Sequence, residues 1–209
     1  MHLKRNYDTI ALFYDRLARL VYGEALIEAQ VSHLKAIPAR AHILIVGGGT
    51  GRILEEIAKV YSSGLCITYI DASAKMIALA KSRDTAGNKV TFIASRIEAI
   101  EAYALYDVVI TPFVLDNFTD EQLPQIGASI DKQLKTNGTW LYCDFQNTNV
   151  FWQQALLKIM YFFFRLTCGI EASRLPAADA WFAQNGYQLK EQITFMNGFV
   201  ASCIYEKKG

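Results

Sequence analysis

The chain has 209 residues, of which 52% are hydrophobic, enough apolar material to bury a full core in one domain. Lys and Arg number 21 and Asp and Glu number 20, so the net charge is +1, and this balance argues against nucleic acid as the partner. The N-terminal segment MHLKRNYDTIALFYD lacks the apolar stretch and cleavage site of a signal peptide, so we expect a cytoplasmic protein.

Residues 1–38 are expected to form a helical extension. Tyr7, Ile10, Tyr14 and Leu17 recur at helical spacing and form one apolar face. Two interpretations remain open. The helix packs on the rest of the domain, or it is a lid whose tyrosines close over a ligand.

Short apolar runs then alternate with helical patterns. We predict strands near 42–47, 65–71, 89–94, 106–111, 138–145, 187–195 and 198–206. We predict helices near 51–61, 73–82, 97–103 and 120–135. Val- and Ile-rich strands that alternate with helices are typical of a parallel sheet covered on both faces. Asn197-Gly198 is a hairpin signal, so the fold class is α/β, doubly wound, with an antiparallel C-terminal pair.

The first predicted strand ends in a glycine-rich turn, ILIVGGGTG at residues 43–51. Glycine permits positive φ, and the backbone N–H groups of such a turn attract a ligand's negative or polar groups. Asp71 ends the next strand, where an acid in doubly wound folds binds ribose hydroxyls. Together they indicate a nucleoside site. The alternatives are a tight strand–helix turn and an Asp71 that caps a helix.

The spacing of the glycines argues against a nicotinamide dinucleotide. A dinucleotide loop reads GxGxxG, and its final glycine would fall at position 52, which is Arg52. The chain instead reads GxGxG through Gly47, Gly49 and Gly51.

This loop resembles that of class I S-adenosylmethionine-dependent methyltransferases, and the resemblance continues in order along the chain. YIDASAKMIALAKSR, VTFIASRIEAI, YDVVITPFVLDNFTDEQL and LKTNGTWLYCDF are similar to the second to fifth strand motifs of that family. The N-terminal YDTIALFYDRLARLVYG is similar to the ubiquinone/menaquinone-biosynthesis type and its small-molecule relatives. The resemblance implies a Rossmann-like, mostly parallel seven-stranded sheet, a helical N-terminal lid and S-adenosylmethionine as the cofactor.

The resemblance also implies which residues bind the cofactor, the glycines making room for its amino-acid and ribose portions. They are Gly47, Gly48, Gly49, Thr50, Gly51, Asp71, Ala72, Met76, Ser95, Arg96, Ile97, Thr111, Pro112, Tyr7 and Tyr14. Two positions depart from the family pattern. Ile45 stands where relatives carry an acid that orients the loop, and Arg96 stands where relatives often carry an aspartate toward the adenine amino group. Arg96 cannot accept a hydrogen bond, so Glu98 or the backbone of residues 95–97 is the alternative acceptor.

Methyl transfer requires alignment of the reactants and, where the acceptor loses a proton, a base. The candidates for catalysis are Asp116, in the loop after the fourth strand, and Asp144, at the end of the fifth. Phe113 and Asn117 of the same loop are candidates for binding the substrate. The alternative for this loop is a plain turn into a helix capped at Thr119.

The stretch from 150 to 166 is apolar except for a narrow polar stripe. Its charges and its length argue against a membrane span. Trp152, Phe162 and Phe163 are candidates for an apolar acceptor pocket, a dimer surface or a membrane-touching face, with core packing as the alternative.

Cysteine and histidine positions give no sign of a metal site, because no Cys-x-x-Cys pair or histidine ligand spacing is present. The positions are Cys66, Cys143, Cys168, Cys203, His2, His33 and His42.

We therefore expect one methyltransferase domain, 1–209, with a cofactor-binding core at 41–146, a helical substrate-covering insert at 147–186 and a C-terminal strand pair at 187–209. The expected function is methyl transfer to a small hydrophobic acceptor by a monomer or homodimer. A non-catalytic binding or scaffolding protein and, less in keeping with Arg52, a nicotinamide-dependent oxidoreductase are the alternatives.

Overall fold

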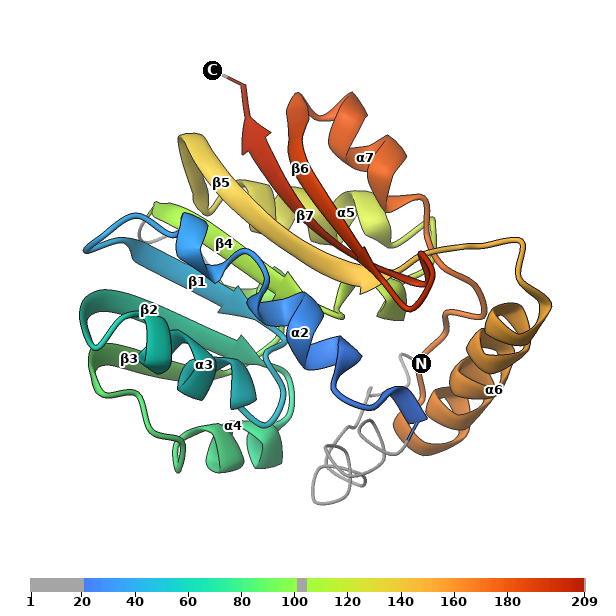
Figure 1. The fold of residues 1–209 in the computed structure, drawn as a ribbon, viewed down its shortest axis with the longest axis horizontal. Coiled ribbons are helices and arrows are strands. Elements are labelled where there is room, and N and C mark those ends of the chain that lie inside the picture. Colours follow the sequence, from blue (N-terminus) through green and yellow to red (C-terminus); the bar gives the residue numbers. More distant parts are fainter. Residues whose placement is uncertain (1–20, 101–104, 209) are drawn as a thin grey trace.

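A computed structural model of the chain describes residues 21–100 and 105–208. Seven strands form one sheet in the order β3-β2-β1-β4-β5-β7-β6 (Figure 1). The strands are β1 (His42–Val46), β2 (Ser63–Asp71), β3 (Gly87–Ala94), β4 (Tyr106–Pro112), β5 (Leu134–Phe145), β6 (Tyr187–Phe195) and β7 (Val200–Lys207). The first five pair in parallel, and β7 runs antiparallel to both β5 and β6. This confirms the predicted α/β fold with its antiparallel C-terminal pair.

Helices connect these strands and cover both faces of the sheet. They are α2 (Ala25–Val31), α3 (Arg52–Val60), α4 (Ala74–Ala80), α5 (Leu123–Asp131), α6 (Phe151–Cys168) and α7 (Ala178–Gln184). Short 3-10 turns lie at η2 (Leu34–Ala36), η3 (Ile97–Ala99) and η4 (Leu115–Asn117). The chain moves outward from β1 to β3 and then returns to place β4 on the other side of β1. Ligands of doubly wound folds bind at such a switch point, beyond the carboxyl ends of the strands.

The alternation of side chains along β1 divides the core between the two faces. Ile43 and Ile45 pack with α3 and α4, whereas Leu44 and Val46 face the side covered by α5 and α7. Both sets are buried, which explains why β1 reads as a continuous apolar run.

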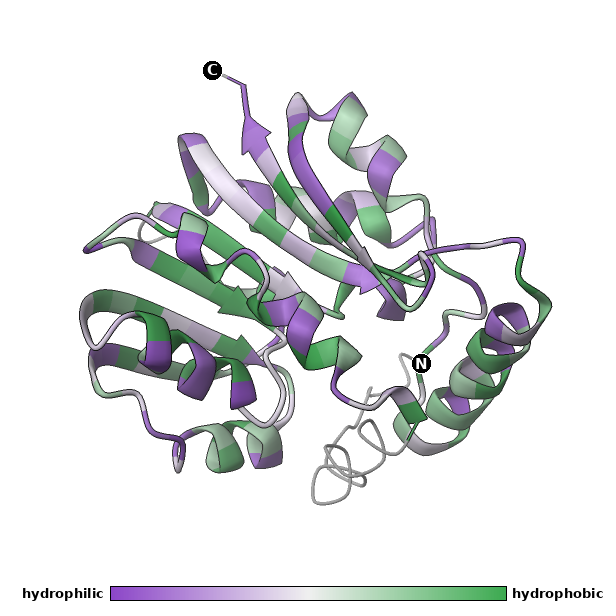
Figure 2. Ribbon diagram, in the orientation of Figure 1, coloured by the Kyte–Doolittle hydropathy of each residue, from purple (hydrophilic) through white to green (hydrophobic). Residues whose placement is uncertain are grey.

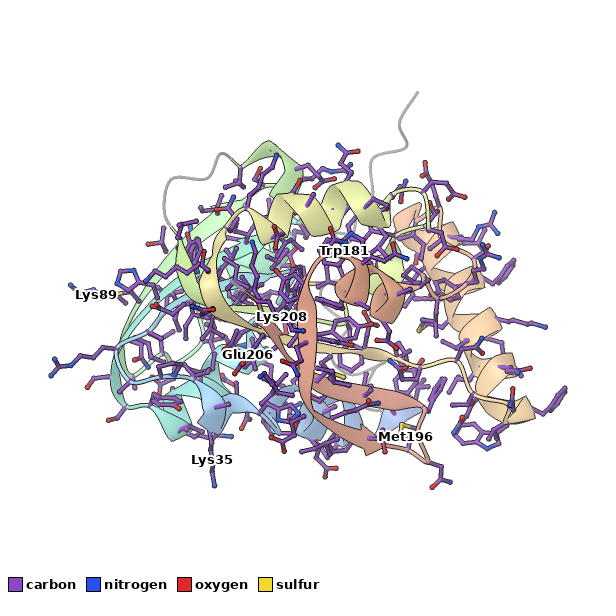
Figure 3. The ribbon with its side chains drawn as sticks, turned by 90° about the horizontal axis from the view of Figure 1, so that it is seen from above. Lys35, Lys89, Trp181, Met196, Glu206 and Lys208 are labelled. Atoms are coloured by element: carbon purple, nitrogen blue, oxygen red, sulfur yellow. The ribbon has the colours of Figure 1, made fainter. Side chains whose placement is uncertain are left out.

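A cluster of aromatic rings anchors α7 to the sheet. Trp181 of α7 lies close to Gly127 of α5 (Figure 3), where an added Cβ would come within 2.3 Å of the indole ring. Trp140 of β5 meets Trp181 edge to face, and Phe182 stacks on Tyr205 with the ring centroids 4.0 Å apart. This cluster fixes β5, whose carboxyl end carries Asp144.

The helix predicted over 120–135 is shorter than expected. It begins at Leu123, with Pro124 in its first turn, because proline suits a position that lacks an intrahelical N–H partner. Thr119 does not cap it with its side chain; the Thr119 carbonyl instead accepts from the amides of Gln122 and Leu123. The predicted helix near 97–103 is only the turn η3 in the described part, which stops at residue 100.

Candidate active site

A cavity of about 780 Å³ opens at the carboxyl ends of β1, β2 and β4. The structure brings most of the predicted cofactor residues to its wall. These are Gly47, Gly48, Gly49, Thr50, Asp71, Ala72, Met76, Ser95, Arg96, Ile97 and Pro112. Gly51 and Thr111 do not line it, because Gly51 packs on α4 and the Thr111 hydroxyl accepts from the Trp140 indole N–H at 2.8 Å. Tyr7 and Tyr14 lie outside the described residues.

The glycines of the loop are required for different reasons. A Cβ on Gly47 would lie 2.5 Å from Val114, one on Gly48 would lie 2.4 Å from the Tyr69 hydroxyl, and one on Gly51 would lie 2.7 Å from Ala80. Only Gly49 has nothing within 4 Å of such an atom, and its φ is 61°. Gly47, Gly48 and Gly51 thus allow close packing within the protein, and a Cβ on Gly49 would meet open space.

Two side chains of β2 hold the peptide groups of Gly49. The Gly49 amide donates to Asp71 Oδ2 at 3.0 Å, and the Tyr69 hydroxyl donates to the Gly49 carbonyl at 3.0 Å. Ile45 pairs with Tyr69 across β1 and β2 and is fully buried in the core. Position 45 of this chain therefore has no carboxylate to orient the loop, and Tyr69 and Asp71 of the neighbouring strand hold the loop instead.

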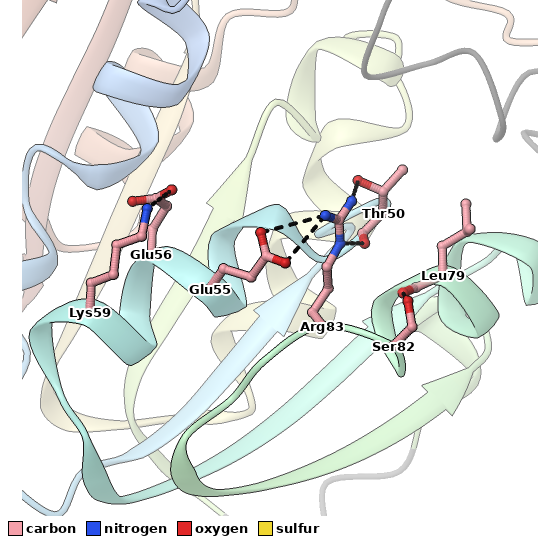
Figure 4. A network of polar contacts seen from close by, with 7 residues as sticks. All are labelled: Thr50, Glu55, Glu56, Lys59, Leu79, Ser82 and Arg83. Carbon is pink, nitrogen blue, oxygen red and sulfur yellow. Dashed lines mark hydrogen bonds and ion pairs between the residues drawn. The ribbon is translucent and has the colours of Figure 1, made fainter.

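Arg83, in the turn after α4, holds the next residue of the loop. Its Nε donates to the Thr50 carbonyl at 3.0 Å, and one Nη donates to the Thr50 hydroxyl at 3.3 Å. The same guanidinium lies 3.4 Å from the Glu55 carboxylate in the first turn of α3 (Figure 4). Arg83 therefore ties the loop to the first turn of α3.

We expect Tyr69→Phe to weaken binding of S-adenosylhomocysteine about two- to tenfold, because one net hydrogen bond to Gly49 is lost. The matched control is Tyr106→Phe, which removes a 3.0 Å hydrogen bond to Thr68 at a residue that does not line the cavity. Calorimetry should show reduced affinity for the first variant alone, whereas both should lose a similar few degrees of Tm. Equal affinities would contradict a role for Tyr69 in the loop.

Asp71 faces the cavity with both carboxylate oxygens already bonded to backbone. Oδ1 accepts from the Ser73 amide at 2.8 Å, and Oδ2 accepts from Gly49. Asp71 is not the cap of α4, since Ser73 occupies the N-cap position and its hydroxyl accepts from the Met76 amide. The carboxylate is therefore fixed in orientation at the place where doubly wound folds bind a ribose.

Arg96 and Glu98 form an ion pair on the cavity wall beyond β3. The Arg96 guanidinium lies 2.8 Å from Glu98 Oε1, and both residues line the cavity. Arg96 stands where relatives often carry an acid, and Glu98, paired with Arg96, brings a carboxylate to the same part of the cavity wall.

Asp116, in the loop after β4, lies beside Asp144 of β5. The Asp116 amide donates to Asp144 Oδ2 at 3.1 Å, and the Phe145 amide donates to Asp144 Oδ1 at 2.9 Å. Asp116 lines the cavity, whereas Asp144 lies behind it. Asn117, which also lines the cavity, donates from its side chain to Asp116 Oδ1 at 2.7 Å.

Burial raises the pKa of both carboxyl groups. Loss of water raises the pKa of Asp116 to about 7, despite the opposing hydrogen bonds from backbone amides. Burial and the neighbouring Asp116 charge also raise the pKa of Asp144 well above its usual range. Because the Asp116 charge disfavours ionisation of Asp144, the two carboxyl groups resist ionising together. At neutral pH the pair therefore retains proton-binding capacity, as a catalytic base requires.

Aromatic side chains also form part of the cavity wall. The Phe145 ring lies 5.3 Å from that of Tyr22 and 5.2 Å from that of Phe113, centroid to centroid. Phe113 has φ 55°, an uncommon conformation for a bulky residue that is found at functional sites. Sequence reasoning missed Tyr22 and Phe145. The position of Phe145 at the carboxyl end of β5 was a signal for it.

The three aromatic candidates on α6 face different directions. Phe163 lines the cavity together with Leu156 and Met160. Phe162 and Trp152 do not line it; their exposed fractions are 66% and 47%. The structure therefore places one of the three predicted substrate residues of this helix at the cavity and two on the outside.

Within residues 21–100 and 105–208, no three His, Cys, Asp or Glu side chains are grouped so that they could hold a metal ion. His33 is buried, with Nε2 3.1 Å from the Ser202 carbonyl, as expected of a packing residue. In the same ranges, no helix combines the length and apolar character needed to cross a membrane.

Known proteins that are similar to this chain are methyltransferases. Residues 43–138 match a family model described as a methyltransferase domain. A ubiquinone biosynthesis O-methyltransferase of Rickettsia akari (strain Hartford) is 33% identical over 116 residues, which are 55% of this chain and 44% of the relative. The chain thus matches less than half the length of that relative.

Solved structures share the fold at low identity. The 1,6-didemethyltoxoflavin-N1-methyltransferase of Burkholderia thailandensis, with 1,6-didemethyltoxoflavin and S-adenosylhomocysteine bound, has a TM-score of 0.67 and 15% identity over 97% of this chain and 86% of its own. The magnesium protoporphyrin IX methyltransferase of Synechocystis PCC 6803, with S-adenosylhomocysteine bound, has a TM-score of 0.68 and 16% identity over 96% and 97%. The strand order and these structures show the fold of S-adenosylmethionine-dependent methyltransferases, and residues 43–138 of the chain match a methyltransferase domain.

Proposed function

We propose that the chain transfers the methyl group of S-adenosylmethionine to a small, largely apolar acceptor. The observation that carries the proposal is a single cavity with two chemically distinct walls. One wall holds the Gly49 turn and the fixed Asp71 carboxylate, and the other holds aromatic side chains around the buried Asp116. A nucleoside-bearing cofactor fits the first wall, and an apolar acceptor fits the second.

The residues present fit S-adenosylmethionine, which supplies an activated methyl group when it is bound. Gly49 leaves open space beside the loop, and Asp71 presents a carboxylate to the ribose hydroxyls. In the Arg96–Glu98 pair of the cavity wall, Glu98 would be the acceptor for the adenine amino group. Met76 and Ile97, both buried, would supply apolar contacts to the base.

At the acceptor end, we assign Asp116 as the base that takes a proton from the acceptor. Its raised pKa allows it to accept that proton near neutral pH. Asp144 acts through Asp116, since it holds the Asp116 amide and lies behind the cavity wall. Phe113, Asn117 and Phe163 complete the wall against which the acceptor lies.

The helix α6 and the segment around it, 147–186, are proposed to cover the acceptor, because Leu156, Met160 and Phe163 close one side of the cavity. The Burkholderia thailandensis methyltransferase of similar fold binds the small molecule 1,6-didemethyltoxoflavin. The relative from Rickettsia akari is a ubiquinone biosynthesis O-methyltransferase. We propose an acceptor of this size class, with an ionisable group at the methylated atom, without choosing among its members.

The test is calorimetric titration of the whole chain with S-adenosylmethionine, S-adenosylhomocysteine and the nicotinamide dinucleotides. We expect binding of the two adenosyl ligands only. Binding of a nicotinamide dinucleotide instead would favour an oxidoreductase. Adenosyl binding without transfer to any small acceptor would favour a non-catalytic binding protein.

Asp71→Ala is expected to weaken S-adenosylhomocysteine binding at least about tenfold, because ribose hydroxyls lose a charged acceptor. The matched control is Asp84→Ala. Asp84 is exposed, and its carboxylate accepts a comparable hydrogen bond from the Ala86 amide at 2.8 Å. The 2′-deoxy analogue of the ligand should bind the wild type more weakly but lose little further in Asp71→Ala. If the two ligands lose affinity equally, Asp71 does not bind the ribose.

A further inference from the structure

Helix α6 exposes an unusually apolar face. Figure 1 shows it beside the sheet rather than on either helical layer, and Figure 2 shows hydrophobic residues along its length. Its most exposed apolar side chains are Phe151 at 86%, Leu166 at 71%, Phe162 at 66% and Ile159 at 65%. At 3.6 residues per turn, these four positions lie on one side of the helix. Apolar side chains scattered singly need no explanation, but a continuous stripe marks an interaction surface.

Charges on α6 indicate what this stripe contacts. Lys158 and Arg165 are exposed along one edge of the stripe, and the helix contains no acidic residue. Apolar side chains flanked by cations are the pattern of a helix that lies in the interface of an anionic membrane. The long stems of Lys158 and Arg165 allow their charges to reach the lipid headgroups while the stripe enters the apolar layer.

The stripe is also continuous with the cavity. Ile159 is 65% exposed and lines the cavity as well, and Phe163 and Leu156 follow it around the helix on the inner side. An apolar surface therefore leads from the outside of α6 to the wall proposed to hold the acceptor.

We propose that the exposed face of α6 binds the surface of an anionic phospholipid membrane, placing the mouth of the cavity against the bilayer. Delivery of an apolar acceptor by this route rests on the proposed function, whereas membrane binding does not. Binding is therefore measured without cofactor or acceptor, so its failure leaves the test of methyl transfer unaffected.

The experiment is co-sedimentation of the whole chain with phosphatidylcholine vesicles and with vesicles that also contain phosphatidylglycerol. We expect binding to the anionic vesicles that weakens as salt is added. Phe162→Ser with Leu166→Ser should reduce that binding at least about tenfold. Lys158→Gln with Arg165→Gln should reduce it about tenfold or more on anionic vesicles only.

Two matched controls remove similar groups elsewhere. Leu189→Ser changes an apolar side chain of β6 that is 44% exposed, and Lys35→Gln with Lys89→Gln removes two exposed cations (Figure 3). Both should bind vesicles like the wild type. Circular dichroism melting verifies that each variant is folded. If Phe162→Ser with Leu166→Ser does not fold, Lys158→Gln with Arg165→Gln still tests whether α6 binds anionic vesicles.

Three outcomes would overturn the proposal. The wild type fails to sediment with anionic vesicles, or the α6 variants bind as well as the controls. In the third, sedimentation velocity shows a homodimer that Phe162→Ser with Leu166→Ser converts to a monomer, because a second copy then covers the stripe.

Discussion

Asp116→Asn is expected to reduce the rate of methyl transfer about a hundredfold or more, the usual contribution of a general base. Asparagine has the same shape and keeps an oxygen that accepts from Asn117, so the wall of the cavity is preserved. It cannot take a proton from the acceptor. Binding of S-adenosylhomocysteine should change little, which separates a loss of chemistry from a loss of the site. A variant with the wild-type rate would remove Asp116 from the reaction.

The same substitution is expected to stabilise the protein at high pH. The folded pKa of Asp116 is raised to about 7, above the ordinary value of 3.8 that applies in the unfolded chain. The stability contributed by the protonated form is fully present below the unfolded pKa and is lost as pH rises through the folded pKa. The wild type should therefore lose on the order of 2–4 kcal/mol between about pH 4 and pH 8 from this group.

Activity and stability should thus change in opposite directions with pH. The wild-type rate should rise through about pH 7 as Asp116 loses its proton, while Tm falls over the same range. Asp116→Asn should flatten that part of the Tm profile, and Asp84→Asn, at an exposed position, should not. An unchanged profile in Asp116→Asn would show that the pKa of Asp116 is not raised.

Asp144→Asn tests the positioning residue separately. The Asp116 charge helps to raise the pKa of Asp144, so Asp144 still carries its proton at the pH where Asp116 loses its own. Asparagine is also neutral and keeps an oxygen for the Asp116 amide, so the midpoint of the rate against pH should stay near that of the wild type. A midpoint that moves to lower pH would show that Asp144 is ionised while Asp116 titrates.

Local sequence features predicted the elements of this fold well. Continuous apolar runs located the strands, and Asn197-Gly198 located the turn of the C-terminal pair. The glycine turn followed by Asp71 also located one wall of the cavity, because both lie at the carboxyl ends of adjacent strands. Such features depend on residues near in sequence, so one chain is enough to recognise them.

Features that depend on distant residues were not predictable. The contact between Gly48 and Tyr69, and that between Gly47 and Val114, join elements whose packing no local pattern specifies. Phe162 and Phe163 adjoin in sequence but lie on different faces of α6, outside and at the cavity. Because the helix is apolar on most sides, its pattern could not say which phenylalanine faces inward.

Gly49→Val is expected to abolish detectable binding of S-adenosylhomocysteine. Gly49 lines the cavity, and among the loop glycines it alone has open space where a Cβ would be added, so a branched side chain would occupy the space proposed for the ligand. The substitution also introduces strain, since φ is 61° and β-branched residues rarely adopt positive φ. Strain by itself would lower stability without explaining lost binding, so a control with equal strain is needed.

Gly198→Val provides that control. Gly198 has φ 83° and nothing within 4 Å of an added Cβ, but it lies in the turn between β6 and β7, away from the cavity. Both variants should lose a comparable amount of Tm, and only Gly49→Val should lose the ligand. If Gly49→Val does not fold, Gly49→Ala carries less strain and still places a methyl group in the cavity. Wild-type affinity in a folded Gly49 variant would mean that the ligand does not lie against this loop, and the assignment of Asp71 to its ribose would fail with it.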